Sequence, residues 1–182
     1  MKKNKTICLI DGSGFIFRAY YALPALSNNK GVPVGAVLGF CNMLFKTLED
    51  DNNEKVVVVF DTARTTFRNK IYPSYKSNRG APPEDLVPQF GLIRKAVDAF
   101  NITRIEMEGY EADDLIATYA KHFSEKSWCV NIISSDKDLM QLVSETIKMT
   151  DPIKNKIIGK EEVFNKFGVY PDKVIDVQSL AG

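Results

Sequence analysis

The chain reads ICLIDG at residues 7–12, a short apolar run that ends in an aspartate followed by a glycine. Two later runs follow the same pattern, since VVVVFD at residues 56–61 and VNIISSD at residues 130–136 also pass from apolar residues to an aspartate. Nearly continuous, β-branched runs of this length are typical of parallel strands that helices cover on both faces. A weaker run at residues 103–107 is the fourth candidate strand. These runs predict a mostly parallel β-sheet buried inside the protein.

Helical patterns lie between the predicted strands. Three segments repeat apolar residues at helical spacing, namely residues 34–48, 84–100 and 112–123. Such an alternation of strands and helices is typical of an α/β domain with a mostly parallel central sheet flanked by helices. Further along, residues 146–158 predict two short strands around a turn at Asp151-Pro152, and residues 160–167 and 172–180 predict two short helices.

Length and composition indicate one ordinary globular domain over residues 1–182. Of the 182 residues, 45% are hydrophobic and 26% charged, which excludes a disordered or fibrous protein. The 24 lysines and arginines nearly balance the 23 aspartates and glutamates, so a uniformly basic nucleic-acid-binding coat is excluded while local basic patches are not. The three cysteines are widely spaced and form no CxxC pair, which favours a reducing compartment over a disulfide framework or a zinc site.

The sequence gives no sign of membrane insertion or secretion. A membrane helix needs about 18 consecutive apolar residues, and no run approaches that length. The apolar stretch after the N-terminal lysines ends at Asp11, which is too early for a secretory signal. We therefore expect a cytoplasmic protein without a membrane partner.

The ends of the predicted strands and the start of one helix supply an unusual set of acids. In an α/β sheet the carboxyl ends of the strands line the ligand-binding crevice. Three strands and the start of the helix at residues 112–123 therefore deliver acids to one edge. The seven candidates are Asp11, Asp61, Glu111, Asp113, Asp114, Asp136 and Asp138.

So many carboxylates in one crevice would repel one another unless cations neutralised them. An all-oxygen site without histidine or cysteine favours Mg²⁺ or Mn²⁺ over zinc, and carboxylates that hold two such ions are a recurrent solution for phosphodiester hydrolysis. An alternative is that individual acids only cap a helix or lie in solvated turns. Glu111, Asp113 and Asp114 together exceed what one helix start needs, so the pattern predicts a divalent-metal site.

Other phosphate chemistries fit the sequence poorly. DGSG at residues 11–14 has two glycines of a dinucleotide-binding fingerprint, but Phe17 stands in the place of the third. The chain has no GxxxxGK[ST] phosphate-binding loop, and Ser13 stands where a phosphoaspartate phosphatase would have its second aspartate. We expect the single histidine, His122, to lie on the surface rather than in a catalytic site.

Residues 64–83 interrupt the alternation of strands and helices. Within them, RTTFRNKIYPSYKSNR at residues 64–79 holds five positive charges, three aromatic residues and no acid. Long irregular loops in compact domains are commonly functional, and basic and aromatic side chains suit the phosphates and unpaired bases of a single strand. A solvated loop with buried aromatic residues is the alternative. Because the segment follows Asp61, we expect a basic flap beside the acidic site, with Arg18 as a further phosphate contact.

Four blocks of the chain resemble the N-terminal 5′-nuclease domain of bacterial DNA polymerase I, a relative of phage 5′-exonucleases and flap endonucleases. The blocks are LIDGSGFIFRAYYAL at residues 9–23, VVVVFDTARTTFRNKIYPSYKSNR at 56–79, EGYEADDLIATYA at 108–120 and IISSDKDLMQLV at 132–143. They occur in the order of the family and span nearly the whole chain. The resemblance implies a PIN-like, resolvase-like α/β fold in which residues 64–83 belong to a helical arch that a 5′-ended strand passes through.

The resemblance also implies roles for individual residues. It implies that the seven acids belong to a site for two Mg²⁺ or Mn²⁺ ions, of which the second is incomplete within these residues. Tyr75, Lys76 and Arg79 match the YKxxR pattern of the family's arch, in which Lys76 and Arg79 would be catalytic residues beside the scissile phosphate. The full set of expected DNA contacts is Arg18, Arg64, Arg68, Lys70, Tyr72, Tyr75, Lys76 and Arg79.

The expected function is that of a monomeric, metal-dependent 5′-3′ exonuclease or 5′-flap endonuclease, part of a DNA polymerase I that acts on DNA in replication and repair. A DNA-structure-binding module without turnover and a PIN-type ribonuclease are the alternatives. In the family, further aspartates of the second metal site and a helix–hairpin–helix element follow a segment like QSLAG at residues 178–182. We therefore expect these 182 residues to have one tight and one weak or vacant divalent site, poor and strongly salt-sensitive DNA binding, and slow or absent cleavage.

Overall fold

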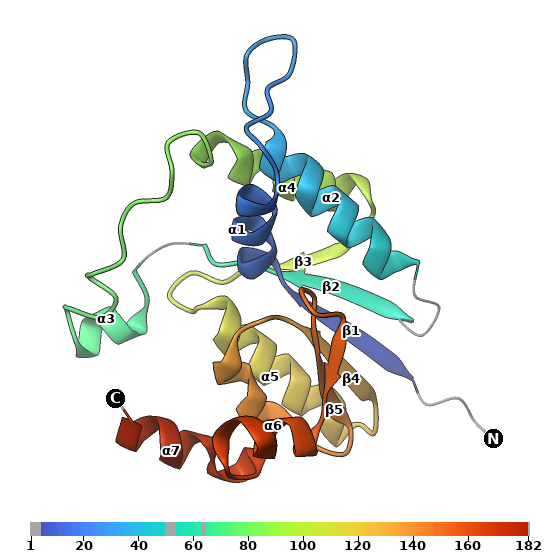
Figure 1. The fold of residues 1–182 in the computed structure, drawn as a ribbon, viewed down its shortest axis with the longest axis vertical. Helices are drawn as coiled ribbons and strands as arrows, with labels where there is room; N and C mark the ends of the chain where they lie inside the picture. Colours follow the sequence, from blue (N-terminus) through green and yellow to red (C-terminus); the bar gives the residue numbers. More distant parts are fainter. Residues whose placement is uncertain (1–4, 50–53, 63–64, 182) are drawn as a thin grey trace.

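A computed structural model describes residues 5–49, 54–62 and 65–181 of the chain. Its centre is a six-stranded sheet in the order β3-β2-β1-β4-β5-β6 (Figure 1). The strands are β1 (Thr6–Asp11), β2 (Lys55–Val59), β3 (Thr103–Ile105), β4 (Cys129–Ile133), β5 (Ile147–Asp151) and β6 (Lys156–Ile158). Strands β1 to β5 pair in parallel and β6 pairs antiparallel with β5, which confirms the predicted mostly parallel sheet.

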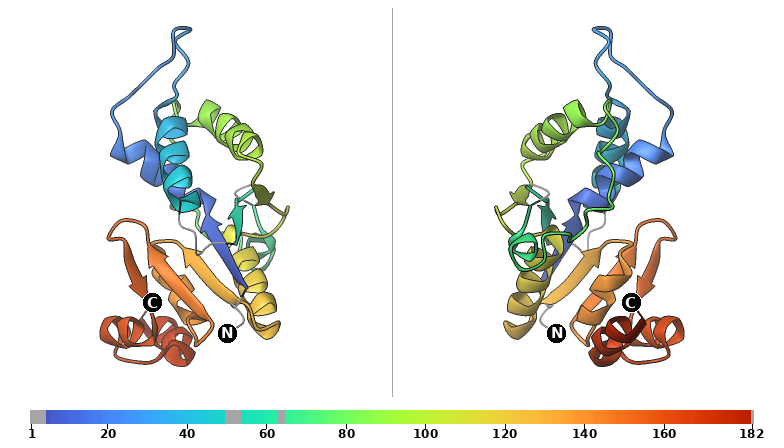
Figure 2. Two further views of the ribbon diagram at one scale, coloured as in Figure 1. Left: turned by 90° about the vertical axis from the view of Figure 1, so that its right-hand side faces the viewer. Right: turned by 90° about the vertical axis from the view of Figure 1, so that its left-hand side faces the viewer.

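Helices cover both faces of the sheet (Figure 2). One face carries α1 (Gly12–Ala22), α2 (Gly35–Leu48) and α4 (Val87–Ala99), and the other carries α5 (Ala112–Glu125), α6 (Lys160–Phe167) and α7 (Val174–Ala181). Because successive side chains of a strand point to opposite faces, Ile7 and Leu9 of β1 pack with α5, while Cys8 and Ile10 pack with α1 and α2. Burial on both faces explains why the apolar runs are continuous.

Most predicted elements are present, with small changes at their ends. Helix α4 begins at Val87 rather than at residue 84, with Pro88 in its first turn, where the missing N–H of proline needs no partner. The two short strands of residues 146–158 and the two C-terminal helices are confirmed. Helix α1 was not among the predicted helices, because Gly12 and Gly14 lower its helix propensity. None of the helices that the structure describes is long and apolar enough to cross a membrane.

Two glycines allow α1 to pack closely on its neighbours. A Cβ atom at Gly12 would lie 2.6 Å from the ring of Phe60, and one at Gly39 of α2 would lie 2.9 Å from the Cβ of Ala19 in α1. Interiors packed this densely tolerate no added methyl group without a shift. Asp11 directly precedes α1 and its carboxylate accepts the backbone N–H of Gly14 at 2.8 Å, so this close packing also fixes the position of Asp11.

Gly39→Ala should therefore lower the free energy of unfolding by about 1–3 kcal/mol, because the added methyl group would force α1 and α2 apart. Gly91 is a matched control in α4, since a Cβ added there would meet nothing within 4 Å. Gly91→Ala should leave stability unchanged or raise it by up to about 1 kcal/mol, as expected for glycine inside a helix. Urea unfolding followed by circular dichroism measures both, and equal effects would contradict the close contact of α1 with α2.

Candidate metal centre

Three parallel strands end side by side at one edge of the sheet. Strand β1 lies between β2 and β4, and the register pairs Asp11 with Val59 and Ile10 with Ile133. The residues that follow β2 and β4 therefore emerge beside Asp11. The chain also adds β2 and β3 on one side of β1 and then crosses to β4 on the other, and α/β proteins place ligand sites at such switch points.

Four aspartates influence one another at this edge: Asp11, Asp61, Asp113 and Asp136, called here the four-aspartate cluster. Asp11 is 8% exposed. Burial raises its pKa and the charges of Asp61 and Asp136 raise it further, although the hydrogen bonds that it accepts oppose the shift. Burial, helped by the charges of the other three aspartates, raises the pKa of Asp113 from its ordinary 3.8 to about 7. Binding of a cation or of protons would therefore stabilise the cluster.

Two serines hold carboxylates of this cluster. The hydroxyl of Ser134 is buried and donates to Asp11 Oδ2 at 2.9 Å, and it also accepts the backbone N–H of Asp136 at 3.0 Å. The hydroxyl of Ser13 donates to Asp61 Oδ2 at 2.5 Å. Neither serine was predicted to have this role, although each stands two residues from an acid of the cluster, which was an available signal.

Asp61 is also held by backbone groups and by an arginine. Its Oδ1 accepts the N–H of Ala112 at 2.8 Å, so the carboxylate lies at the positive end of α5. Arg94 of α4 donates to the backbone carbonyl oxygen of Asp61 at 2.8 Å and pairs with Glu106 at 3.0 Å. Arg94 was not among the predicted site residues, and no motif could have revealed it, because 33 residues separate it from Asp61.

The carboxylate oxygens of the cluster lie near one another but do not surround a common point. Within residues 5–49, 54–62 and 65–181, no three acidic, histidine or cysteine side chains already stand at a spacing that would hold a metal ion. The charges of Asp61 and Asp136 nevertheless lie near enough to raise the pKa of both Asp11 and Asp113, so the two observations together describe a loose group of like charges. Carboxylate oxygens are the ligands that hard divalent cations prefer. The donor set therefore fits such a cation chemically.

The other two acids at the start of α5 contact the predicted arch. Both terminal nitrogens of Arg68 donate to the carboxylate of Asp114, each at 2.7 Å, and this pairing lowers the pKa of Asp114. Lys76 Nζ donates to Glu111 Oε1 at 2.7 Å, and the hydroxyl of Tyr75 donates to Glu111 Oε2 at 3.2 Å. Glu111 and Asp114 are thus neutralised by cations of the arch, unlike the four-aspartate cluster.

The seventh predicted acid, Asp138, lies at the rim. Its side chain is exposed and accepts the side-chain amide of Gln178 from α7 at 2.6 Å. Its backbone N–H donates to Asp136 Oδ1 at 2.9 Å, within the 3₁₀ turn η1 (Lys137–Leu142). Asp138 is therefore linked to the cluster through the backbone rather than through its carboxylate.

The predicted arch leaves the sheet edge after β2 and returns to α4 as an open loop (Figure 1). Part of it is helical, since α3 (Phe67–Ile71) begins with a capping box between Thr66 and Asn69. Arg68, Tyr75 and Lys76 contact α5. Of the other predicted DNA contacts, Lys70, Tyr72 and Arg79 are exposed, Arg18 is partly buried on α1, and Arg64 lies outside the described residues. His122 is exposed, as predicted.

The raised pKa of Asp113 predicts a pH-dependent gain in stability for Asp113→Asn. An acid whose pKa is higher in the folded state destabilises the fold progressively as pH rises from about 4 to about 7. Without divalent ions, the variant should match the parent near pH 4 and exceed it above pH 7, by at most about 4 kcal/mol. Thermal melts across this pH range measure the effect. Glu125→Gln, which changes an exposed acid of the same helix, is the control, and an identical pH profile for both variants would contradict the assignment.

Comparison with known sequences finds one matching family profile and several similar proteins. A sequence profile described as 5′-3′ exonuclease, N-terminal resolvase-like domain, matches residues 6–168. The chain is 54% identical to DNA polymerase I of Rhizobium leguminosarum, covering 100% of this chain and 19% of that protein. It is 43% identical to the 5′-3′ exonuclease of Aquifex aeolicus, covering 98% of this chain and 62% of that protein. The chain therefore spans less than two thirds of these relatives.

Solved structures share the fold at low sequence identity. The bacteriophage T5 D15 protein, co-crystallised with metal ions, superposes with a TM-score of 0.77 at 17% identity, covering 98% of this chain and 66% of that one. The catalytic core of Rad2 in complex with a DNA substrate superposes with a TM-score of 0.59 at 20% identity, covering 98% and 55%. The predicted PIN-like fold is thereby confirmed. Because the profile covers nearly the whole chain, the protein belongs to the family of 5′-3′ exonuclease N-terminal resolvase-like domains.

Proposed function

We propose that this chain is the catalytic domain of a divalent-metal-dependent 5′-nuclease that hydrolyses phosphodiester bonds of DNA at a 5′ end or 5′ flap. The observation that carries the proposal is the contact between an acidic sheet edge and a basic, aromatic arch, made by Arg68, Tyr75 and Lys76 on the start of α5. Support comes from relatives named 5′-3′ exonuclease and DNA polymerase I. Further support comes from a structural neighbour described as a flap endonuclease in complex with DNA and metal ions.

The acidic edge is the proposed metal site. The four-aspartate cluster would hold Mg²⁺ or Mn²⁺, with Glu111, Asp114 and Asp138 completing the set of seven acids. When bound, such ions supply an activated water and stabilise the leaving oxygen of the phosphodiester. Ser134 and Ser13 keep Asp11 and Asp61 in fixed orientations through their hydroxyl groups, as groups behind metal ligands commonly do.

The arch is the proposed binding site for the single-stranded 5′ end. Lys76 has a φ of 55°, a backbone conformation uncommon for a residue other than glycine, and its amine lies at the acidic edge. We assign Lys76 and Arg79 to the reacting phosphate, where positive charge stabilises the charge that develops during cleavage. Tyr72 and Tyr75 offer ring faces for unpaired bases, and Arg18, Arg64 and Lys70 are proposed phosphate contacts further along the strand.

Cleavage of three substrates tests the proposal. A 5′-flap DNA, a plain single-stranded DNA and a hairpin RNA are each mixed with excess protein and Mg²⁺ or Mn²⁺. We expect cutting of the flap near its junction and no cutting in EDTA or by the Asp113→Asn variant. Preferential cutting of RNA would indicate a ribonuclease, and binding of the flap without cutting would indicate a DNA-structure-binding module. Either result would refute the proposed activity.

The roles assigned within the arch predict different kinetic effects. Lys76→Ala and Arg79→Ala should slow single-turnover cleavage by on the order of 100-fold with little loss of DNA affinity, because their charges act mainly on the transition state. Lys70→Ala should instead weaken DNA binding and flatten its salt dependence. Single-turnover rates and fluorescence-anisotropy titrations separate the two effects. Equal, purely binding losses in all three variants would contradict the catalytic assignment.

A further inference from the structure

Arg68 is held by the protein more tightly than a free phosphate-binding side chain would be. Its two terminal nitrogens both bond to Asp114 at 2.7 Å, the forked geometry in which a planar guanidinium matches a carboxylate. Its central carbon lies 4.6 Å from the ring centre of Phe67 and 5.8 Å from that of Tyr75. The hydrogen-bonding fork and the adjacent rings thus engage Arg68 within the chain itself.

Asp114 is fixed to α5 by the same carboxylate that receives Arg68. Its Oδ2 accepts the backbone N–H of Glu111 at 3.0 Å, which forms part of the capping box at the start of the helix. A displacement of Asp114 would therefore disturb the first turn of α5. That turn carries Asp113 of the four-aspartate cluster and begins at Ala112, whose N–H binds Asp61.

The arch is attached to the domain at both of its ends. At the first end, the N–H of Phe67 donates to the carbonyl oxygen of Gly109 at 2.9 Å, and the Phe67 and Tyr110 rings lie 5.6 Å apart. Just beyond the second end, the hydroxyl of Tyr20 in α1 donates to Asp85 at 2.8 Å. The side chain of Arg68 adds a charged attachment next to the first end, between that end and Lys76.

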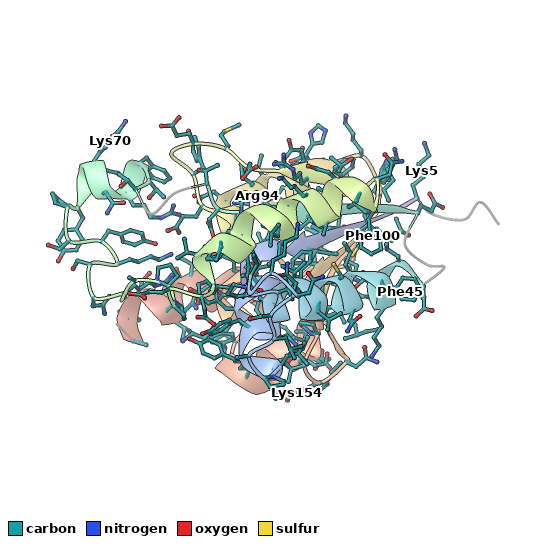
Figure 3. All side chains as sticks on the ribbon, turned by 90° about the horizontal axis from the view of Figure 1, so that it is seen from above. Lys5, Phe45, Lys70, Arg94, Phe100 and Lys154 are labelled. Atoms are coloured by element: carbon teal, nitrogen blue, oxygen red, sulfur yellow. The ribbon has the colours of Figure 1, made fainter. Side chains whose placement is uncertain are left out.

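We infer that Arg68 is a positioning residue that fastens the arch to α5 through Asp114. Held in this way, the arch keeps Lys76 at the acidic edge. Lys70, two residues further on, differs from Arg68 because it is exposed and projects away from the rest of the molecule (Figure 3). The purpose of the attachment rests on the proposed function, whereas the attachment itself belongs to the chain without DNA or metal.

Amide hydrogen–deuterium exchange of the metal-free, DNA-free chain tests the attachment directly. In Arg68→Ala, peptides covering residues 67–79 should exchange roughly tenfold faster, because the variant lacks the charge-assisted pair that opposes opening of the arch. Arg68→Lys should show the same gain, since a single ammonium group does not reproduce the fork. Lys70→Ala, which removes one charge from the same helix, should leave these peptides unchanged. Peptides from β1 serve as the internal reference for global stability.

A double variant identifies the partner. If Arg68 acts through Asp114, then Arg68→Ala combined with Asp114→Ala should exchange no faster in the arch than either single variant. Unchanged exchange in both Arg68 variants, or fully additive effects in the double variant, would overturn the inference. Neither exchange measurement requires nuclease activity, so the two measurements test the inference independently of the proposed function.

Cleavage supplies a second and separate test. Arg68→Lys should lower the single-turnover rate while leaving the affinity for 5′-flap DNA and its salt dependence unchanged. A phosphate contact would behave differently, because lysine would preserve it and Arg68→Ala would reduce the slope of affinity against salt by about one. Full rescue by lysine together with a reduced slope in the alanine variant would refute the positioning role.

Discussion

Mutual repulsion among partly buried carboxylates is the constraint on which the rest of this structure depends. Removing an acid from water raises the free energy of its charged form, and a second acid nearby raises it again. The chain offsets this repulsion with fixed groups: Asp11 caps α1, Asp61 lies at the positive end of α5, and two serine hydroxyls donate to the same carboxylates. What remains uncompensated is concentrated at Asp113. The site is therefore prepared for positive charge before any ligand arrives.

The two halves of the acidic edge meet this constraint in different ways. In the four-aspartate cluster, backbone N–H groups and hydroxyl groups hold the carboxylates, and the pKa values of Asp11 and Asp113 are raised. Glu111 and Asp114 instead pair with a lysine and an arginine from a segment more than thirty residues away in the sequence. The acidic edge and the basic arch thus stabilise each other. Without Glu111 and Asp114, Arg68 and Lys76 would have no carboxylates to pair with. Without the arch, these two acids would lose the cations that neutralise them.

The sequence was sufficient to predict the sheet and the acids that lie at its edge, for identifiable physical reasons. Continuous apolar runs report burial on both faces, and parallel strands in register bring the residues that follow them to one edge, so Asp11 and Asp61 could be placed together. The contacts that orient these acids could not be predicted, since they join distant residues: Ser134 and Asp11 are 123 positions apart, and Arg68 and Asp114 are 46 apart. The arch cations were expected to face DNA, and only the coordinates reveal that Arg68 and Lys76 face carboxylates of the chain itself.

The double use of Asp11 has a consequence for genetics. The same carboxylate begins α1 and belongs to the proposed metal site, so a mutation at this position affects folding and chemistry together, and its phenotype reports neither trait alone. Asp113 has no such capping duty among the hydrogen bonds described above, and it carries the least compensated charge. Replacing Asp113 would separate the two traits, which makes it the better choice for an inactive allele that still accumulates as folded protein.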